Sequence, residues 1–235
     1  MPRPHLTAVL EKVNLSRPPV AIAFLQAAPS DLGRISEPAA AGCSYWKHAS
    51  EGHAFYTTSA DHQNCPVGAM THGVTLSPEK SQELQSLVNT MVELRYLSSE
   101  EIPRIPHRTE AFGVAAYAPL DRASFEPDVV VFRGNARQIM LLSEAARAAG
   151  AFEGGTVMGR PACAMLPQVI GTNSAAASIG CIGNRVYTGL GDDELYLAVP
   201  GRALEAMFSK LDTILSANGA LEAFHRQRAA ALGGA

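Results

Sequence analysis

The chain has 235 residues, of which 47% are hydrophobic, with a formal net charge of −3 at pH 7 and an isoelectric point near 6.2. A nucleic-acid partner is not expected, because neutralising phosphates requires a surplus of Lys and Arg on one face. No apolar segment is long enough for a membrane span or a secretory signal, so we expect a cytoplasmic protein without a membrane partner.

The first third of the chain contains several predicted elements. Apolar residues at helical spacing between positions 6 and 13 predict an opening amphipathic helix that ends near Asn14. Residues 20–25 form a continuous apolar run after two prolines, which predicts a strand buried on both faces. Residues 43–49 fit a short helix, and Pro66 can open another directly after Cys65. Helix N-termini lower the pKa of a thiol, so we expect Cys43 and Cys65 to be reactive or to bind a metal.

The remainder alternates between strand and helix signals. Ser77 begins a predicted helix that reaches residue 97 and has an apolar stripe for packing. Two prolines mark residues 101–108 as an extended connector and as the candidate boundary between halves. Strands are predicted at residues 112–118, 129–132 and 195–199. A helix capped by Asn135 ends at Gly150, and a strongly amphipathic helix begins near residue 204, followed by a peripheral helix after residue 218.

Alternating strands and helices predict an α/β or α+β fold, with mixed sheet layers and flanking helices. We expect a single domain over residues 1–235, or two pseudo-symmetric halves, 1–105 and 106–235, that share one central site. The cysteines suggest this division, because 21 residues separate the first two and 17 separate the last two. If a pseudo-twofold axis relates the halves, four sulfur atoms can converge on one point.

All four cysteines lie in two segments rich in glycine and polar residues, residues 42–73 and 159–185. In a reducing compartment such cysteines are thiols or metal ligands. Four thiolates can hold an iron–sulfur cluster or a zinc ion, although the chain lacks the C-x-x-C pairs of dedicated sites. The candidate metal ligands are Cys43, Cys65, Cys163 and Cys181. The alternative is that they are buried thiols that act as small apolar residues.

Other polar residues near the cysteines complete the expected pocket. Arg160 and Arg185 flank the second pair and can bind a carboxylate or phosphate, or offset the charge of a thiolate-bound cluster. The remaining candidates for cofactor binding are Asn173, Gly180 and Asn184. Histidines in the first segment admit a mixed metal site, since imidazole suits zinc and iron.

The cysteine segments resemble the uncharacterised archaeal and bacterial cysteine-rich family called domain of unknown function 169. The shared motifs are P-P-V-A-I at residues 18–22, C-x-x-W with A-x-x-G at 43–52, N-C-P-x-G at 64–68, and G-R-P-A-C with G-C-x-G-N-R within 159–185. The resemblance implies that all four cysteines belong to the family pattern, but it implies no reaction. Many relatives carry a further cysteine-rich tail, whereas residues 221–235 contain no cysteine, so we expect one cluster at most.

We therefore expect a protein that binds a cubane-type iron–sulfur cluster and acts on a small sulfur-containing or acidic metabolite, as a lyase, a sulfur-transfer enzyme or an oxidoreductase. Two alternatives stay open. One is a binding or carrier module for a small anion or organic cofactor, with the cysteines as reduced thiols. The other is a structural zinc protein. The sequence is also compatible with a homodimer.

Overall fold

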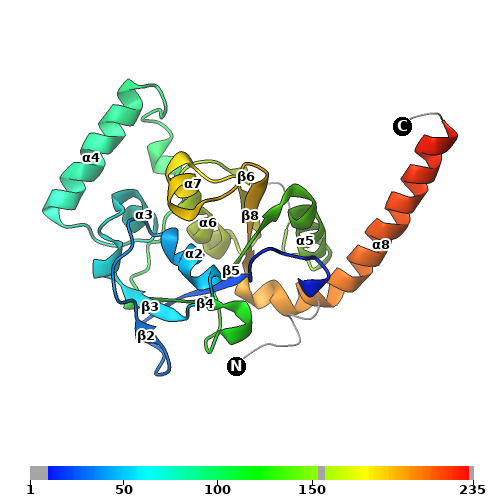
Figure 1. Ribbon diagram of the computed structural model, residues 1–235. Coiled ribbons are helices and arrows are strands. Elements are labelled where there is room, and N and C mark those ends of the chain that lie inside the picture. Colours follow the sequence, from blue (N-terminus) through cyan, green and yellow to red (C-terminus); the bar gives the residue numbers. More distant parts are fainter. Residues whose placement is uncertain (1–9, 153–156, 233–235) are drawn as a thin grey trace.

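The fold is that of a computed structural model, which describes residues 10–152 and 157–232. Its centre is one mixed sheet of eight strands in the order β2-β3-β4-β1-β5-β8-β7-β6. Seven α-helices flank this sheet within the two described ranges (Figure 1). This architecture confirms the predicted α/β fold with a mixed sheet and flanking helices.

Strands and helices alternate along most of the chain. The strands are β1 (Val20–Leu25), β2 (Gly33–Arg34), β3 (Phe55–Thr58), β4 (Val114–Pro119), β5 (Val129–Asn135), β6 (Val157–Met158), β7 (Ala176–Ser178) and β8 (Glu194–Pro200). The helices are α2 (Ser44–Ser50), α3 (Pro66–Thr71), α4 (Pro78–Glu93), α5 (Ala136–Ala148), α6 (Met165–Thr172), α7 (Ile182–Thr188) and α8 (Leu204–Ala231).

Strand β1 lies at the centre of the sheet, between β4 and β5. Ala21 and Ala23 belong to the core on one face, which α5 and α8 cover. Val20, Ile22 and Phe24 belong to the core on the other face, which α2 and α6 cover. A strand with both faces covered has to be apolar throughout, and this is why its continuous apolar run predicted it correctly.

The sheet has the same arrangement when followed inward from either edge. A parallel pair, β2-β3 or β6-β7, is followed by two antiparallel pairs, and the halves join at the antiparallel pair β1-β5. In chain order the first half runs from β1 to β4 and the second from β5 to β8. Because α2 and α6 lie on the same face, this topology implies a pseudo-twofold axis perpendicular to the sheet, between β1 and β5.

The strand registers repeat as well. Pro119, the last residue of β4, pairs with Val20, and Pro200, the last residue of β8, pairs with Val129. The backbone N–H that follows each proline donates to the carbonyl just before the partner strand, at 2.8 Å in the first half and 2.9 Å in the second. The halves therefore share one strand topology and one register pattern, and the chain passes from the first to the second between β4 and β5. The connector at residues 101–108 lies within the first half, so the halves do not divide at residue 105.

Signals with a clear local cause predicted their elements well. Ser77 caps α4 by accepting a hydrogen bond from the Lys80 N–H at 3.2 Å, and Asn135 caps α5 in the same way. The predicted peripheral helix is not separate, since α8 continues to Ala231. Most of the predicted opening helix lies outside the described residues. The end of this helix is described, and its residue Leu10 packs into the core.

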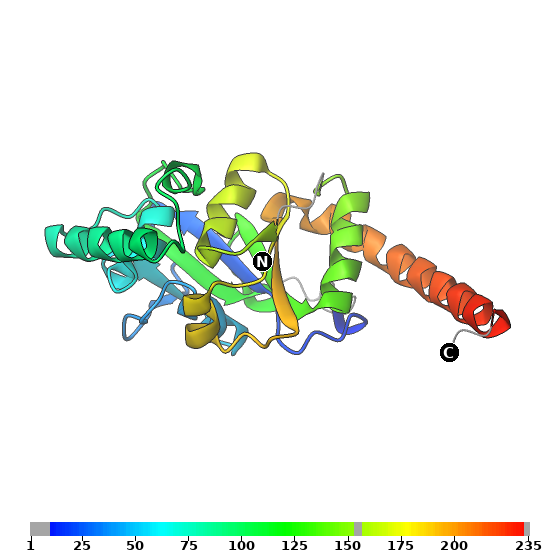
Figure 2. The same ribbon diagram turned by 90° about the horizontal axis from the view of Figure 1, so that it is seen from above.

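Two helices extend from opposite ends of the molecule. Figure 2 shows α4 at one end and the outer part of α8 at the other. Helix α4 buries no side chain, whereas the first turns of α8 pack against the sheet. None of the helices in the described part of the chain is both long enough and apolar enough to cross a membrane.

Candidate functional site

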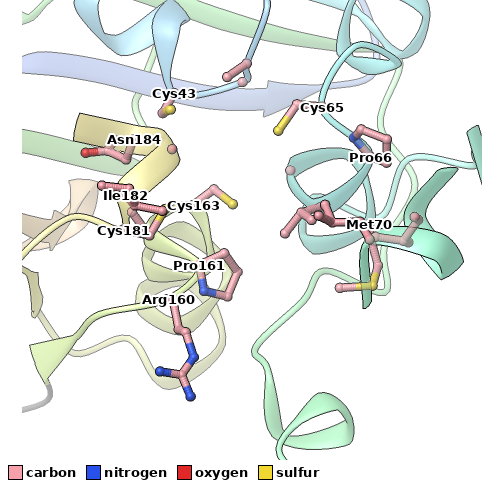
Figure 3. Close-up of a pocket in the computed structure, with 18 of the residues that line it drawn as sticks. Cys43, Cys65, Pro66, Met70, Arg160, Pro161, Cys163, Cys181, Ile182 and Asn184 are labelled. Atoms are coloured by element: carbon pink, nitrogen blue, oxygen red, sulfur yellow. The ribbon is translucent and has the colours of Figure 1, made fainter. Parts of the chain in front are cut away.

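A pocket of about 390 Å³ lies between α3, α4 and α7 and contains all four cysteines in its wall. Cys43 precedes α2, Cys65 precedes α3 and Cys181 precedes α7, while Cys163 lies in the short 3-10 helix (Ala162–Ala164) before α6. In Figure 3, Cys65 stands across the open space from Cys163 and Cys181. The fold thus brings together four side chains that are far apart in the sequence.

Cys43 and Cys163 are the buried pair, with 7% and 8% of their surface exposed. Burial raises the pKa of the Cys43 thiol to about 12 and raises the pKa of Cys163 further, because a buried thiolate loses its hydration. The other thiols add to both increases. The hydroxyl of Thr71 opposes the increase at Cys163 by donating a hydrogen bond to its Sγ at 3.3 Å.

This result corrects one prediction. We expected the helix that follows Cys43 to lower the pKa of its thiol. Cys43 does lie at the N-terminus of α2, but desolvation outweighs any effect of the helix, and the thiol of the metal-free protein is protonated at pH 7. Any ligand that binds the thiolate form has to displace this proton.

Cys65 and Cys181 are the more accessible pair, and each is only partly buried at the start of a helix. A glycine fixes the space beside Cys65. A Cβ atom at Gly68 would lie 3.0 Å from the Cys65 Sγ, closer than ordinary van der Waals contact. The sulfur therefore occupies room that is available because residue 68 has no side chain.

The two candidate metals need different arrangements of their ligands. Over residues 10–152 and 157–232, no group of three or more Cys, His, Asp or Glu side chains is placed to hold a metal ion. A structural zinc requires four Cys or His ligands around one ion, with each sulfur about 2.3 Å from it. A cubane cluster instead offers a separate iron to each thiolate, so its ligands stand further apart. Four thiols line one pocket, but within the described residues they do not form a site for a single metal ion.

Asn184 is a buried polar residue in the wall of the pocket, with 2% of its surface exposed. Its amide lies near enough to Cys43 and Tyr196 to oppose the increase that burial causes in their pKa values. Neither its nitrogen nor its oxygen has a hydrogen-bond partner of good geometry. The amide of Asn184 is therefore a buried polar group whose nearest polar neighbours, Cys43 and Tyr196, satisfy it poorly.

The other predicted cofactor residues are placed differently. Arg160 lines the pocket, where it pairs with Glu101 at 2.8 Å. Arg185 does not line it, because its guanidinium donates to the backbone carbonyls of two neighbouring loops. Gly180 supports the site indirectly, since a Cβ there would lie 2.9 Å from the Asn184 Oδ1. Asn173 ends α6 at an exposed position away from the pocket.

The histidines of the first segment do not line the pocket. His62 and His72 are buried behind Gly42, with their ring centroids 5.8 Å apart. Burial lowers the pKa of His62 to about 4 and that of His72 to about 3, so both are neutral at pH 7. His48 and His53 lie nearer the surface. The mixed cysteine–histidine site is therefore not assembled in this pocket.

Sequence reasoning missed the part of the pocket that α4 forms. Its apolar stripe was predicted to pack against the protein, yet α4 buries no residue, and Leu84, Leu87, Val88 and Met91 line the pocket instead. A stripe that faces a cavity has the same helical spacing as one that faces a core. Position in the fold, rather than periodicity, distinguishes the two.

Comparison with known proteins identifies the family. Residues 9–210 match the family described as Uncharacterised ArCR. The chain belongs to domain of unknown function 169. An uncharacterised protein of Methanocaldococcus jannaschii is 28% identical over 162 residues, which cover 66% of this chain and 68% of that protein. No solved structure matches the chain. The resemblance seen in the cysteine motifs is confirmed, and the activity has to be argued from the site.

Proposed function

We propose that this member of domain of unknown function 169 binds one cubane-type iron–sulfur cluster through Cys43, Cys65, Cys163 and Cys181. The supporting observation is that these cysteines, from four distant segments, line one pocket. They also form two equivalent pairs in the repeated topology. Thiols used only as small apolar side chains would have no need to converge in this way.

The surrounding residues suit such a role. Thr71 can donate a hydrogen bond to the Cys163 sulfur, and hydrogen bonds to the sulfurs tune a cluster's potential. The largely apolar wall limits the access of water, which also affects the potential. A cluster held by all four thiolates would supply electron transfer, whereas one held by three would leave an iron that could supply Lewis acidity.

An enzyme that acts on a small metabolite is the form of this proposal that the pocket favours. Its volume of about 390 Å³ falls within the range of small-molecule sites, roughly 300–1,000 Å³. Lyase, sulfur-transfer and oxidoreductase chemistry are all compatible with a cluster that faces an open cavity. A cytoplasmic location is part of the same proposal, since all four cysteines are free and thiols persist in reducing compartments.

Spectroscopy of anaerobically purified protein tests the proposal. We expect broad visible absorption, and an electron paramagnetic resonance signal after one-electron reduction with dithionite. Both signals should be absent from the Cys181→Ser variant if all four thiolates are required. Colourless wild-type protein with one bound zinc would instead establish the structural-zinc alternative.

A carrier module with reduced thiols is the second candidate, and one observation favours it. The pKa values of Cys43 and Cys163 are raised, and their thiols are neutral and stable in an apolar wall without any metal. Metal-free protein whose four thiols all titrate with a thiol reagent after denaturation, and which takes up no iron and sulfide on reconstitution, would support this candidate.

A further inference from the structure

The pocket extends well beyond the cysteines, and its far end is apolar. This end is formed by one side of α4 and by the segment that follows it. The apolar side chains that line it are Leu84, Leu87, Val88, Met91, Tyr96, Leu97, Ile102 and Ile105. The pocket therefore has a thiol end, to which Cys43 and Asn184 contribute, and a hydrocarbon end.

Charged groups contribute little to this space. Among the described residues, the charged side chains in the wall are Glu83 and Arg160. Glu83 is paired with Lys80 at 2.7 Å. Arg160 is paired with Glu101 at 2.8 Å and lies over the ring of Tyr96, with its guanidinium carbon 4.6 Å from the ring centroid. Both charges therefore have partners within the protein.

Helix α4 contributes to the pocket but not to the core. It lies in the long connection between α3 and β4, residues 72–113. The corresponding connection in the second half, between α7 and β8, is only residues 189–193 and contains no helix. Helix α4 also buries no side chain, although its apolar residues face the cavity. An apolar stripe kept against an open cavity is unfavourable in water unless a ligand covers it.

We infer that the pocket binds an uncharged, mainly apolar small organic molecule, which lies along α4. The observations that carry this inference are the apolar wall along α4 and the pairing of Glu83 and Arg160 within the protein. The inference deepens the proposed function by giving its substrate class, and it departs from the acidic metabolite expected from the arginines. Binding of the molecule does not itself require the cluster.

Two probes of the same chain length test this inference on the full-length, anaerobically purified protein. Decanol is uncharged, and decanoate carries a negative charge in place of the hydroxyl group. We expect decanol to bind in calorimetric titration and to bind at least tenfold more tightly than decanoate. Tighter binding of decanoate, lost in Arg160→Gln, would overturn the inference in favour of an anion site.

A matched pair of variants locates the binding. Leu87→Glu places a charge in the apolar wall, at a residue that is 43% exposed and not needed for packing. We expect this substitution to weaken decanol binding at least tenfold. Leu94→Glu introduces the same charge at a residue that is 73% exposed and outside the pocket, and it should leave binding unchanged. Equal effects of the two variants, or no decanol binding by the wild type, would overturn the inference.

Two further measurements separate the possible causes of failure. Iron content should be the same in Leu87→Glu and in the wild type, so loss of decanol binding with normal iron concerns the apolar site alone. A wild-type protein that binds decanol but holds no iron would instead contradict the proposed cluster alone. Light scattering covers the remaining alternative, since a dimer dissociated by Leu87→Glu would show that a second copy covers α4, which would overturn the inference.

Discussion

Cys43 and Cys163 occupy equivalent positions in the two halves. Cys43 follows the edge strand β2 and directly precedes α2. Cys163 follows the edge strand β6 and lies in the short 3-10 helix before α6. Helices α2 and α6 each cover one half of the sheet. Each cysteine is buried to the same extent, and burial raises the pKa of each thiol. Cys65 and Cys181 form the second equivalent pair, each beginning the helix after β3 or β7.

This equivalence predicts how cysteine substitutions behave. Cys43→Ser and Cys163→Ser should reduce the bound iron to a similar extent, because each removes the same ligand from one half. Ser44→Ala is the control, since Ser44 is buried beside Cys43 but does not line the pocket. Iron analysis of the three variants is the measurement. Full iron in one cysteine variant and none in the other would contradict equivalent roles.

Gly68 gives a prediction about the position of one sulfur. Gly68→Ala should decrease the bound iron, because the added Cβ at 3.0 Å displaces the Cys65 Sγ. The free energy of unfolding of the Gly68→Ala variant should be unchanged or up to about 1 kcal/mol higher, because alanine favours a helix more than glycine does. Urea unfolding and iron analysis measure the two effects.

The control for this variant is another helical glycine in the same pocket. Gly183→Ala adds a Cβ at an ordinary distance of 3.7 Å from the Tyr187 ring, and so should gain stability without losing iron. Equal iron in both variants would show that the space at Gly68 is not needed for metal binding.

The raised thiol pKa values predict a pH dependence for the metal-free protein. Below pH 9, the ordinary pKa of a thiol, Cys43 is protonated in both the folded and unfolded states, so it adds no pH dependence. Between pH 9 and about pH 12 the unfolded thiol loses its proton while the folded thiol keeps it. The free energy of unfolding should then fall by up to about 1.4 kcal/mol per pH unit for this thiol.

Urea unfolding of wild type and Cys43→Ala at several pH values above 9 measures this contribution. The decrease with pH should be shallower in the variant, which lacks the titrating group. The same slope in both proteins would mean that the Cys43 thiol does not have a raised pKa in the folded state.

The sequence was most informative where a local cause determines structure. Val20–Leu25 was predicted from its apolar run, and α5 from the cap at Asn135, because each signal is contained in a few neighbouring residues. Strands β2, β6 and β7 are only two or three residues long, and no period can be read from so few positions. The repeat was suggested by the cysteine spacing but became visible only in the strand registers.

For the candidate site, the sequence indicated which residues gather but not their surroundings. Glycine and cysteine together marked both segments of the pocket. The burial of Cys43, which reverses the expected change in its pKa, depends on tertiary packing that no motif encodes. The same is true of Arg160 and Arg185, whose partners lie on other segments and leave neither guanidinium free for an anion.

The burial of Asn184 gives a prediction about both the stability of the protein and its binding of decanol. Asn184→Leu replaces a buried amide without a partner by an apolar side chain of similar volume. The free energy of unfolding of the metal-free protein should therefore stay the same or rise by about 1 kcal/mol. Decanol binding should stay unchanged, because neither polar atom of the Asn184 side chain is exposed to the pocket. A variant that is strongly destabilised would show that Asn184 serves the fold.

The most direct test of the central claim is the amount of iron and acid-labile sulfide in anaerobically purified wild-type protein. A cubane cluster held by the four cysteines predicts about four irons and four sulfides per chain, both lost when any of these cysteines is replaced by serine. Protein that contains neither iron nor sulfide, even after anaerobic reconstitution with both, would contradict it.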